Sequence, residues 1–198
     1  MGYDTTFTGE FNLDKPLDPR HKAYLDAFAN TRRVTRDPVV NATMMDAIRV
    51  AAGLSYKPEY YVGSATDGDF GQSSTPDIID GNRPPEGQPS LWCDWAPNED
   101  GTAIVWTESE KFYQYIEWIT YLVENFLRPW GYVLNGMVSW QGEEPGDVGV
   151  IELRNNEVNP EKKTSPVTKD APSSDNRGGV FNFNVTVTHN LRRIELEV

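Results

Sequence analysis

The segment that decides the fold is residues 90–140, which read SLWCDWAPNEDGTAIVWTESEKFYQYIEWITYLVENFLRPWGYVLNGMVSW. It holds all six tryptophans of the chain. Asp100-Gly101 lies between two runs rich in tryptophan and aliphatic residues, which is the pattern of a β-hairpin with a tight turn. Counting back from this turn places Trp95 directly opposite Trp106, and such a cross-strand aromatic pair stabilises a hairpin. The segment therefore predicts two antiparallel strands.

A helix is predicted directly after the hairpin. Thr107 to Glu110 fits a capping box, and apolar residues then recur at helical spacing as far as Leu127. The helix is therefore expected to cover about 110–127 and to stop at Arg128-Pro129, since proline cannot continue a helix. The residues expected to face the core are Phe112, Ile116, Ile119, Val123 and Phe126.

Further strands and two N-terminal helices complete the predicted domain. The strands are expected over Tyr3–Leu13, Tyr132–Gln141 and Val148–Arg154. Asp18-Pro19 and Asp37-Pro38 each combine an N-cap aspartate with a proline in the first helical position, which is a start signal for a helix. The first helix is expected to reach about Arg33, and the second to cover 39–52.

The predicted fold class is α+β. Hairpins imply an antiparallel sheet, and the 110–127 helix is expected to pack on one face of it. Residues 1–160 form this domain, and the polar Pro/Ser/Gly-rich residues 161–179 are predicted as a flexible linker. Alternation of apolar and polar residues resumes over 180–198, which is predicted as a C-terminal β segment. Because such short strands need a neighbour, this segment is expected to add to a sheet edge, within one chain or between the chains of a homo-oligomer.

Composition favours a folded cytoplasmic protein. The chain has 198 residues, of which 38% are hydrophobic, and its single cysteine, Cys93, cannot form an intramolecular disulfide. The first residues lack the basic and apolar regions of a signal peptide. The most hydrophobic stretch, 112–127, contains Glu117 and Glu124, so a buried helix face is expected rather than a membrane span. If a phage encodes the chain, its expected location is the cytoplasm of the host cell.

Charge is distributed unevenly along the chain. The net charge is −12, and residues 59–124 hold 13 acidic side chains against two cations, Arg83 and Lys111. Such an acidic surface disfavours direct binding of nucleic acid, because phosphates need basic partners. It predicts instead an interaction surface for a protein. The acidic residues assigned to that surface are Asp77, Asp80, Glu86, Glu117 and Glu124.

A long loop over residues 63–89 is the predicted place for a ligand. It is rich in glycine, proline and aspartate, and a loop of this length in a compact domain is often functional. The candidate ligand-binding residues are Asn82, Arg83, Asp67 and Asp69. Arg83 is expected to clamp the loop to a carboxylate or, alternatively, to bind an anion. No metal or cofactor is predicted, since the stretch that begins at Asp67 has Ile78 where a calcium loop needs a glutamate, and no phosphate-binding glycine motif is present.

Several short motifs resemble a family of small acidic proteins found in bacteria, notably actinomycetes, and in their phages. They are Asn82-Arg83-Pro84-Pro85, Trp92-Cys93-Asp94-Trp95, Asp100-Gly101-Thr102-Ala103-Ile104, Pro129-Trp130-Gly131-Tyr132, Leu134-Asn135-Gly136 and Trp140-Gln141-Gly142-Glu143. The resemblance covers about residues 1–157, and the extension over 161–198 departs from it. The family has no established activity, so the resemblance implies no catalytic residue.

The sequence supports one leading function and two alternatives. The leading prediction is a non-enzymatic interaction protein derived from a phage or prophage, which engages a host or phage protein; an inhibitor of a host defence system is one concrete form. The first alternative is a small-ligand-binding protein or enzyme with its site under the 63–89 loop. The second is a structural component of a virion that uses its C-terminal strands.

Overall fold

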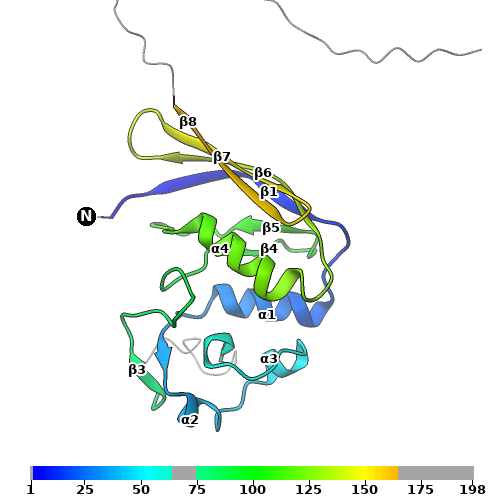
Figure 1. Ribbon diagram of the computed structural model, residues 1–198, viewed down its shortest axis with the longest axis vertical. Coiled ribbons are helices and arrows are strands. Elements are labelled where there is room, and N and C mark those ends of the chain that lie inside the picture. The colour runs from blue at the N-terminus through cyan, green and yellow to red at the C-terminus, as the bar shows by residue number, and fades with distance from the viewer. Residues whose placement is uncertain (1, 64–74, 165–198) are drawn as a thin grey trace, which may run out of the picture. The chain divides into compact units, whose positions relative to one another are not determined.

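A six-stranded antiparallel sheet forms one side of the domain (Figure 1). The computed structural model describes residues 2–63 and 75–164, which fall within one unit, Met1–Pro166. The strands run in the order β4-β5-β1-β6-β7-β8. Their bounds are Thr5–Leu13 for β1, Trp95–Pro97 for β4, Ala103–Trp106 for β5, Leu134–Gly142 for β6, Asp147–Arg154 for β7 and Glu157–Thr164 for β8. The α+β class is therefore confirmed, as is the antiparallel sheet.

The tryptophan hairpin has the predicted register. Trp95 pairs directly with Trp106 across β4 and β5. The loop that joins these strands is closed by Asn98, whose backbone N–H donates to the carbonyl of Ala103 at 2.9 Å. Gly101 adopts a positive φ of 71° at the tip of the loop, a conformation that glycine reaches without strain.

Strand β8 was not expected from the sequence. Asn155 and Asn156 form a two-residue turn between β7 and β8, with φ of 51° and 69°. Positive φ at both central residues is the geometry of the common hairpin turn, and asparagine tolerates it. Strand β8 continues through Thr164, so it includes the first four residues of the predicted linker. The rest of that linker and the predicted β segment 180–198 lie outside the described residues.

The prediction of one long α-helix over 110–127 is wrong in two respects: the helix begins later, and its last turn is not α-helical. Helix α4 covers only Tyr115–Leu122, and the next five residues, Val123–Leu127, form one π-helical turn, η2. The capping box does not form; the hydroxyl of Thr107 instead lies 3.0 Å from that of Ser109. Residues 107–114 form an irregular connection because three of them have positive φ: Glu108, Lys111 and Gln114.

The prediction of two N-terminal helices is also wrong, because the first helix is shorter than expected and the second is divided in two. Helix α1, Pro19–Ala29, begins at its Asp18 cap but ends four residues before Arg33. The expected second helix over 39–52 is split into α2, Pro38–Asn41, and α3, Ala47–Ala51. Asp46 causes the split, because its side chain accepts from the backbone N–H of Arg49 and so caps a separate helix.

The two short helices α2 and α3 belong to a second, smaller lobe. It contains α2, α3, the 3₁₀ turn η1 (Pro58–Tyr60) and a two-stranded sheet of β2 (Thr35–Arg36) and β3 (Ile78–Asp80). Figure 1 places α2, α3 and β3 at the end of the domain opposite the large sheet. We call this region the small lobe.

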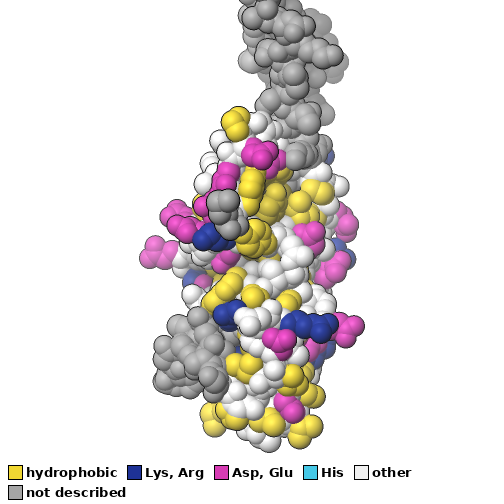
Figure 2. Space-filling view, turned by 90° about the vertical axis from the view of Figure 1, so that its left-hand side faces the viewer, with side chains coloured by type: hydrophobic (Ala, Val, Ile, Leu, Met, Phe, Trp, Pro, Cys, Tyr) yellow, Lys and Arg dark blue, Asp and Glu magenta, His cyan; other side chains and the backbone are white. Residues whose placement is uncertain are grey.

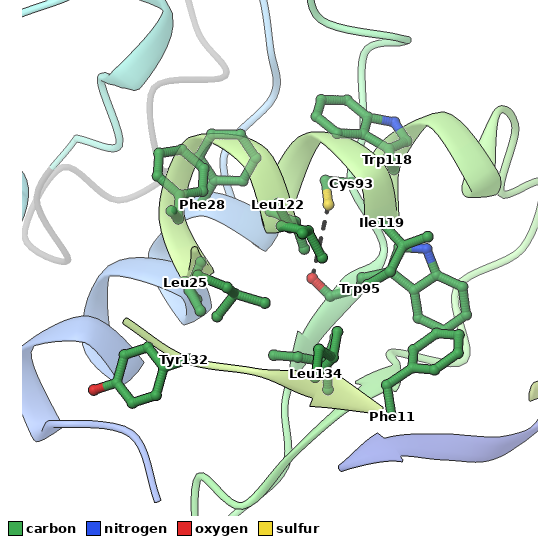
Figure 3. Packing of buried hydrophobic residues seen from close by; sticks show 14 of the residues in the cluster. Phe11, Leu25, Phe28, Cys93, Trp95, Trp118, Ile119, Leu122, Tyr132 and Leu134 are labelled. Atoms are coloured by element: carbon green, nitrogen blue, oxygen red, sulfur yellow. Dashed lines mark hydrogen bonds between the residues drawn. The ribbon is translucent and has the colours of Figure 1, made fainter. Parts of the chain in front are cut away.

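The hydrophobic core lies between the large sheet, α4 with η2, and α1 (Figure 3). Its largest fully buried side chains include Trp95, Trp118 and Phe11. Trp118 and Leu122 of α4 are buried although the predicted core stripe omitted them, while Ile116 of that stripe is only partly buried. Cys93 is fully buried, and its thiol lies 3.7 Å from the carbonyl oxygen of Trp95.

Candidate functional site

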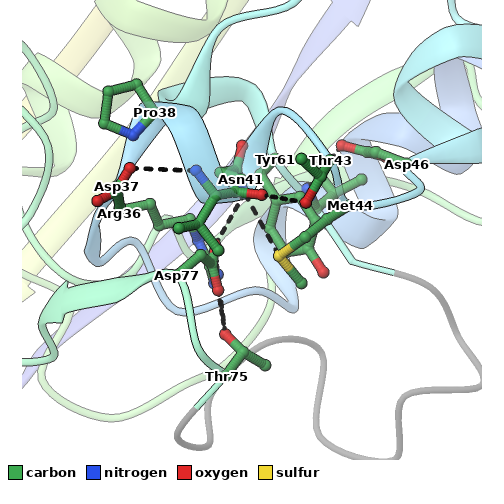
Figure 4. A network of polar contacts seen from close by, with 12 residues as sticks. Arg36, Asp37, Pro38, Asn41, Thr43, Met44, Asp46, Tyr61, Thr75 and Asp77 are labelled. Atoms are coloured by element: carbon green, nitrogen blue, oxygen red, sulfur yellow. Dashed lines mark hydrogen bonds and ion pairs between the residues drawn. The ribbon is translucent and has the colours of Figure 1, made fainter.

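A buried polar network holds the small lobe together (Figure 4). The Arg36 guanidinium and the Asp77 carboxylate form an ion pair at 2.7 Å, with side chains 2% and 0% exposed. Asn41 donates to the same carboxylate at 2.8 Å, and the Thr75 hydroxyl donates to its other oxygen. Burial alone would raise the pKa of Asp77, but the hydrogen bonds from Thr75, Arg36 and Asn41 outweigh it and hold the pKa below its ordinary value. The assignment of Asp77 to an interaction surface was therefore wrong, because this carboxylate is a structural partner of Arg36.

The other predicted site residues are not brought together. Asn82 accepts a hydrogen bond from Arg32 at 3.3 Å, and the backbone carbonyl of Arg83 accepts from Thr35 at 2.9 Å. The guanidinium of Arg83 is exposed and has no hydrogen bond or ion pair to any residue in 2–63 or 75–160, so the expected clamp is not seen there. Asp67 and Asp69 lie outside the described residues.

Four of the predicted acidic surface residues are exposed. Asp80 lies in β3, Glu86 follows it in the loop, and Glu117 and Glu124 lie on the outer side of α4 and η2. They therefore form a spread negative surface rather than one site.

Large apolar side chains are exposed on the small lobe. Val39 of α2 is 75% exposed, Met45 85%, Val50 of α3 63% and Ile79 of β3 63%. Figure 2 shows hydrophobic side chains gathering at the lower end of the face in view, where α2 and β3 lie. We call these four residues the lobe surface.

A pocket of about 940 Å³ lies between the end of α1, residues 84–94 and the 107–113 part of the irregular connection. Its lining includes Ala29, Pro89, Trp92, Asp94, Ser109 and Tyr113. Two of its walls, Pro84 and Pro89, belong to the loop under which the sequence predicted a ligand site. The ligand-site hypothesis stays a prediction, and of its four residues neither Asn82 nor Arg83 lines this pocket.

The alternation of an extended chain explains how Asp94 reaches this pocket. Cys93 and Trp95 are buried in the core, so the side chains of Trp92 and Asp94 project to the other side and line the pocket. The backbone N–H of Thr107 donates to the carbonyl of Asp94 at 3.0 Å, which continues the β4–β5 register by one pair. Glu108, with φ of 63°, then bends the chain away from the ladder.

Asp94 is the most perturbed carboxyl near this pocket. Asp94 is only 7% exposed. Desolvation raises the pKa of its carboxyl to about 6, and a hydrogen bond from Ser109 offsets part of this rise. Throughout the part of the chain that the structure describes, no cationic side chain lies within ion-pair distance of it. A buried carboxyl that lines a pocket and has a raised pKa is a candidate functional group.

A second pocket, of about 430 Å³, lies on the other side of the irregular connection. Tyr3, Gln114, Tyr115 and Asp147 are among the residues that line it, and the Tyr3 hydroxyl donates to Asp147 at 2.6 Å. Desolvation raises the pKa of Tyr115 to about 12, so its hydroxyl stays protonated at neutral pH. Tyr113 lines both pockets.

One sequence signal points to burial of Asp94. It is the only charged residue in the run Trp92-Cys93-Asp94-Trp95, and a charge inside such an apolar run is a candidate for burial. Its position in a pocket had no sequence signal, because the opposite wall comes from residues 107–113, which were expected to cap and begin a helix.

Comparisons with known proteins gave no match, whether against models of protein families, curated proteins or solved structures. The resemblance of the short motifs to the family of small acidic proteins remains a prediction. Among the described helices, none has both the length and the apolar character that crossing a membrane requires.

Proposed function

We propose that this protein is a non-enzymatic interaction protein, and that it binds a partner protein through the lobe surface. The observation that supports this most directly is the exposure of four large apolar side chains on one small lobe. Where apolar groups gather on a folded domain, as Figure 2 shows at the end of the lobe that carries α2 and β3, they are typical of surfaces that a partner covers. The lobe surface would form the apolar centre of the interface.

An exposed carboxylate lies at the edge of this interface. Asp80 is exposed directly beside Ile79, and the whole chain carries a net charge of −12. A partner with an apolar patch surrounded by lysine and arginine therefore fits the surface best. The buried Arg36–Asp77 pair fixes β2, α2 and the start of β3 relative to one another, so the surface would be preformed.

The origin and partner of the protein belong to the same proposal. The motif resemblance to proteins of bacteria and their phages supports a chain derived from a phage or prophage, with a host or phage protein as its partner. Inhibition of a host defence system is one concrete form of this function.

A matched pair of substitutions tests the use of the lobe surface. Met45 on the small lobe and Met137 on β6 are both exposed, at 85% and 62%, so Met45→Ser and Met137→Ser make the same change at two places. A partner captured from host lysate in stoichiometric amount by the native chain should be lost with Met45→Ser and kept with Met137→Ser. Equal capture by all three chains would reject the lobe surface as the interface.

A further inference from the structure

We propose that the pocket around Asp94 binds a cationic group, an alkylamine or a guanidine, carried on an apolar body. The pocket shares no residue with the lobe surface, so this proposal does not depend on the proposed function. Four properties of the pocket support it: an unbalanced charge, aromatic walls, apolar walls and a suitable volume.

The first property is the isolated carboxylate. Asp94 is 7% exposed and, within residues 2–63 and 75–160, no lysine, arginine or histidine pairs with it. Burying a carboxylate without a partner of opposite charge is unfavourable. A cation that enters the pocket removes this cost, so the pocket favours ligands that carry one.

The other charged groups of the pocket do not change its preference for a cationic ligand. Glu110 and Lys111 also line it, and the Lys111 ammonium lies 3.9 Å from the Glu110 carboxylate. These two charges offset each other, which leaves the charge of Asp94 unbalanced. Tyr113 is the remaining titratable group in the lining. An anionic ligand would thus meet a net negative site.

The second and third properties concern the walls. Trp92 and Tyr113 line the pocket, and a cation is attracted to the face of an aromatic ring. Pro84, Pro89 and Leu91 offer apolar contact. A carboxylate combined with aromatic and proline side chains suits a charged head on a hydrocarbon or ring body better than a small inorganic cation, which would need several oxygen ligands.

The volume and construction of the pocket complete the argument. About 940 Å³ lies near the upper end of the range for small-molecule sites, roughly 300–1,000 Å³. One wall is the irregular connection, in which Glu108 and Lys111 have positive φ without being glycine. Such strained residues are retained where the surrounding structure requires them, and they concentrate at functional sites.

The test uses hexylamine and hexylguanidine as cationic probes and hexan-1-ol as the neutral probe. Calorimetric titration of the intact chain at neutral pH should show binding of either cation and none of the alcohol. Asp94→Asn should weaken binding of the cations at least tenfold, while Glu124→Gln, a change at an exposed carboxylate of η2, should leave it unchanged. Asp94→Asn is expected to fold, because it removes an unpaired buried charge.

Two further measurements make the assignment specific. Lowering the pH from 7.5 to 5 should weaken binding to the native chain, as Asp94 takes up a proton, but should not change the residual binding of Asp94→Asn. A lysine-containing peptide that binds more tightly than hexylamine would assign the pocket to a side chain of a partner, and equal affinities would assign it to a free amine. Failure of both cations to bind, or equal affinity in Asp94→Asn, would overturn the proposal.

Discussion

At the scale of single residues, Asp94 is the clearest case of a side chain whose buried position lowers the stability of the folded protein when its carboxyl is ionised. The pKa of its carboxyl rises from 3.8 to about 6 on folding, mainly through desolvation. The folded protein therefore binds this proton more tightly than the unfolded chain does. Stability from this group is fully present below pH 3.8 and is lost as the pH rises through about 6.

Asp94→Asn should therefore stabilise the protein at pH 7. The rise of about two pKa units corresponds to about 3 kcal/mol, and we expect a gain of about 1–3 kcal/mol in the free energy of unfolding. Urea denaturation at pH 7 and at pH 4 measures this gain, which should shrink toward zero at the lower pH. A loss of stability at pH 7 would show that the ionised carboxylate has a partner that stabilises it.

Trp95 is a residue whose importance followed from the sequence alone. It is 1% exposed, its ring contacts Phe7, Phe11 and Phe112, and its indole N–H donates to the carbonyl of Tyr115 at 2.8 Å. Trp95→Ala should lower the free energy of unfolding by about 3–5 kcal/mol, because it leaves a cavity and an unsatisfied acceptor. Trp106→Ala, at the partly buried partner position, should cost less in the same chemical denaturation series. A loss below about 1 kcal/mol for Trp95→Ala would contradict its place in the core.

The difference between Trp95 and Asp94 shows which parts of a site a sequence can predict. The pairing of Trp95 with Trp106 depends only on a local turn, so counting along the chain was sufficient. The pocket around Asp94 depends on where residues 107–113 go. Their path is set by positive φ at Glu108 and Lys111, a conformation for which non-glycine residues carry no reliable local signal.

At the scale of elements, the small lobe depends on the ion pair between β2 and the segment before β3. Asp77→Asn should lower the free energy of unfolding by about 3–5 kcal/mol, because it leaves Arg36 buried without its carboxylate. The pKa of Asp77 is depressed, so its contribution is present above the ordinary value of 3.8 and is lost as the pH falls through the lower folded value.

The control for this prediction is Asp80→Asn, since Asp80 is exposed in the neighbouring strand. It should change stability by less than about 0.5 kcal/mol. Urea denaturation gives the stabilities, and limited proteolysis reports whether residues 75–80 have detached. Equal stability of the two variants would show that the ion pair contributes nothing to holding the lobe.

The helix errors have physical causes that lie in tertiary structure. The pattern over 110–127 has helical spacing, and Phe112 is buried as expected, yet Phe112 reaches the core from the irregular connection before α4. An apolar residue at the right spacing thus satisfied the helical pattern without being in the helix. In the N-terminal region, Asp46 offered a third cap that a continuous pattern over 39–52 concealed. The N-caps at Asp18 and Asp37 were local signals and were predicted correctly.

At the scale of the whole molecule, the net charge of −12 should act on association rather than on the final affinity of the lobe surface. Asp80, Glu86, Glu117 and Glu124 are exposed on different elements, so a basic partner meets a broad negative field before any close contact forms. Exposed charges farther apart than about 10 Å are largely screened at 0.1 M salt.

The rate of association with a basic partner should therefore fall as salt rises from low to physiological concentration, by tenfold or more where steering dominates. The dissociation rate should change much less, because the apolar contacts of Val39 and Met45 are not screened by ions. Surface plasmon resonance over a salt series separates the two rates. The combined variant Glu117→Gln and Glu124→Gln should reduce the salt dependence of association while leaving dissociation unchanged, since neither residue belongs to the lobe surface. An association rate that is independent of salt would remove the acidic surface from recognition and leave the apolar side chains to account for it alone.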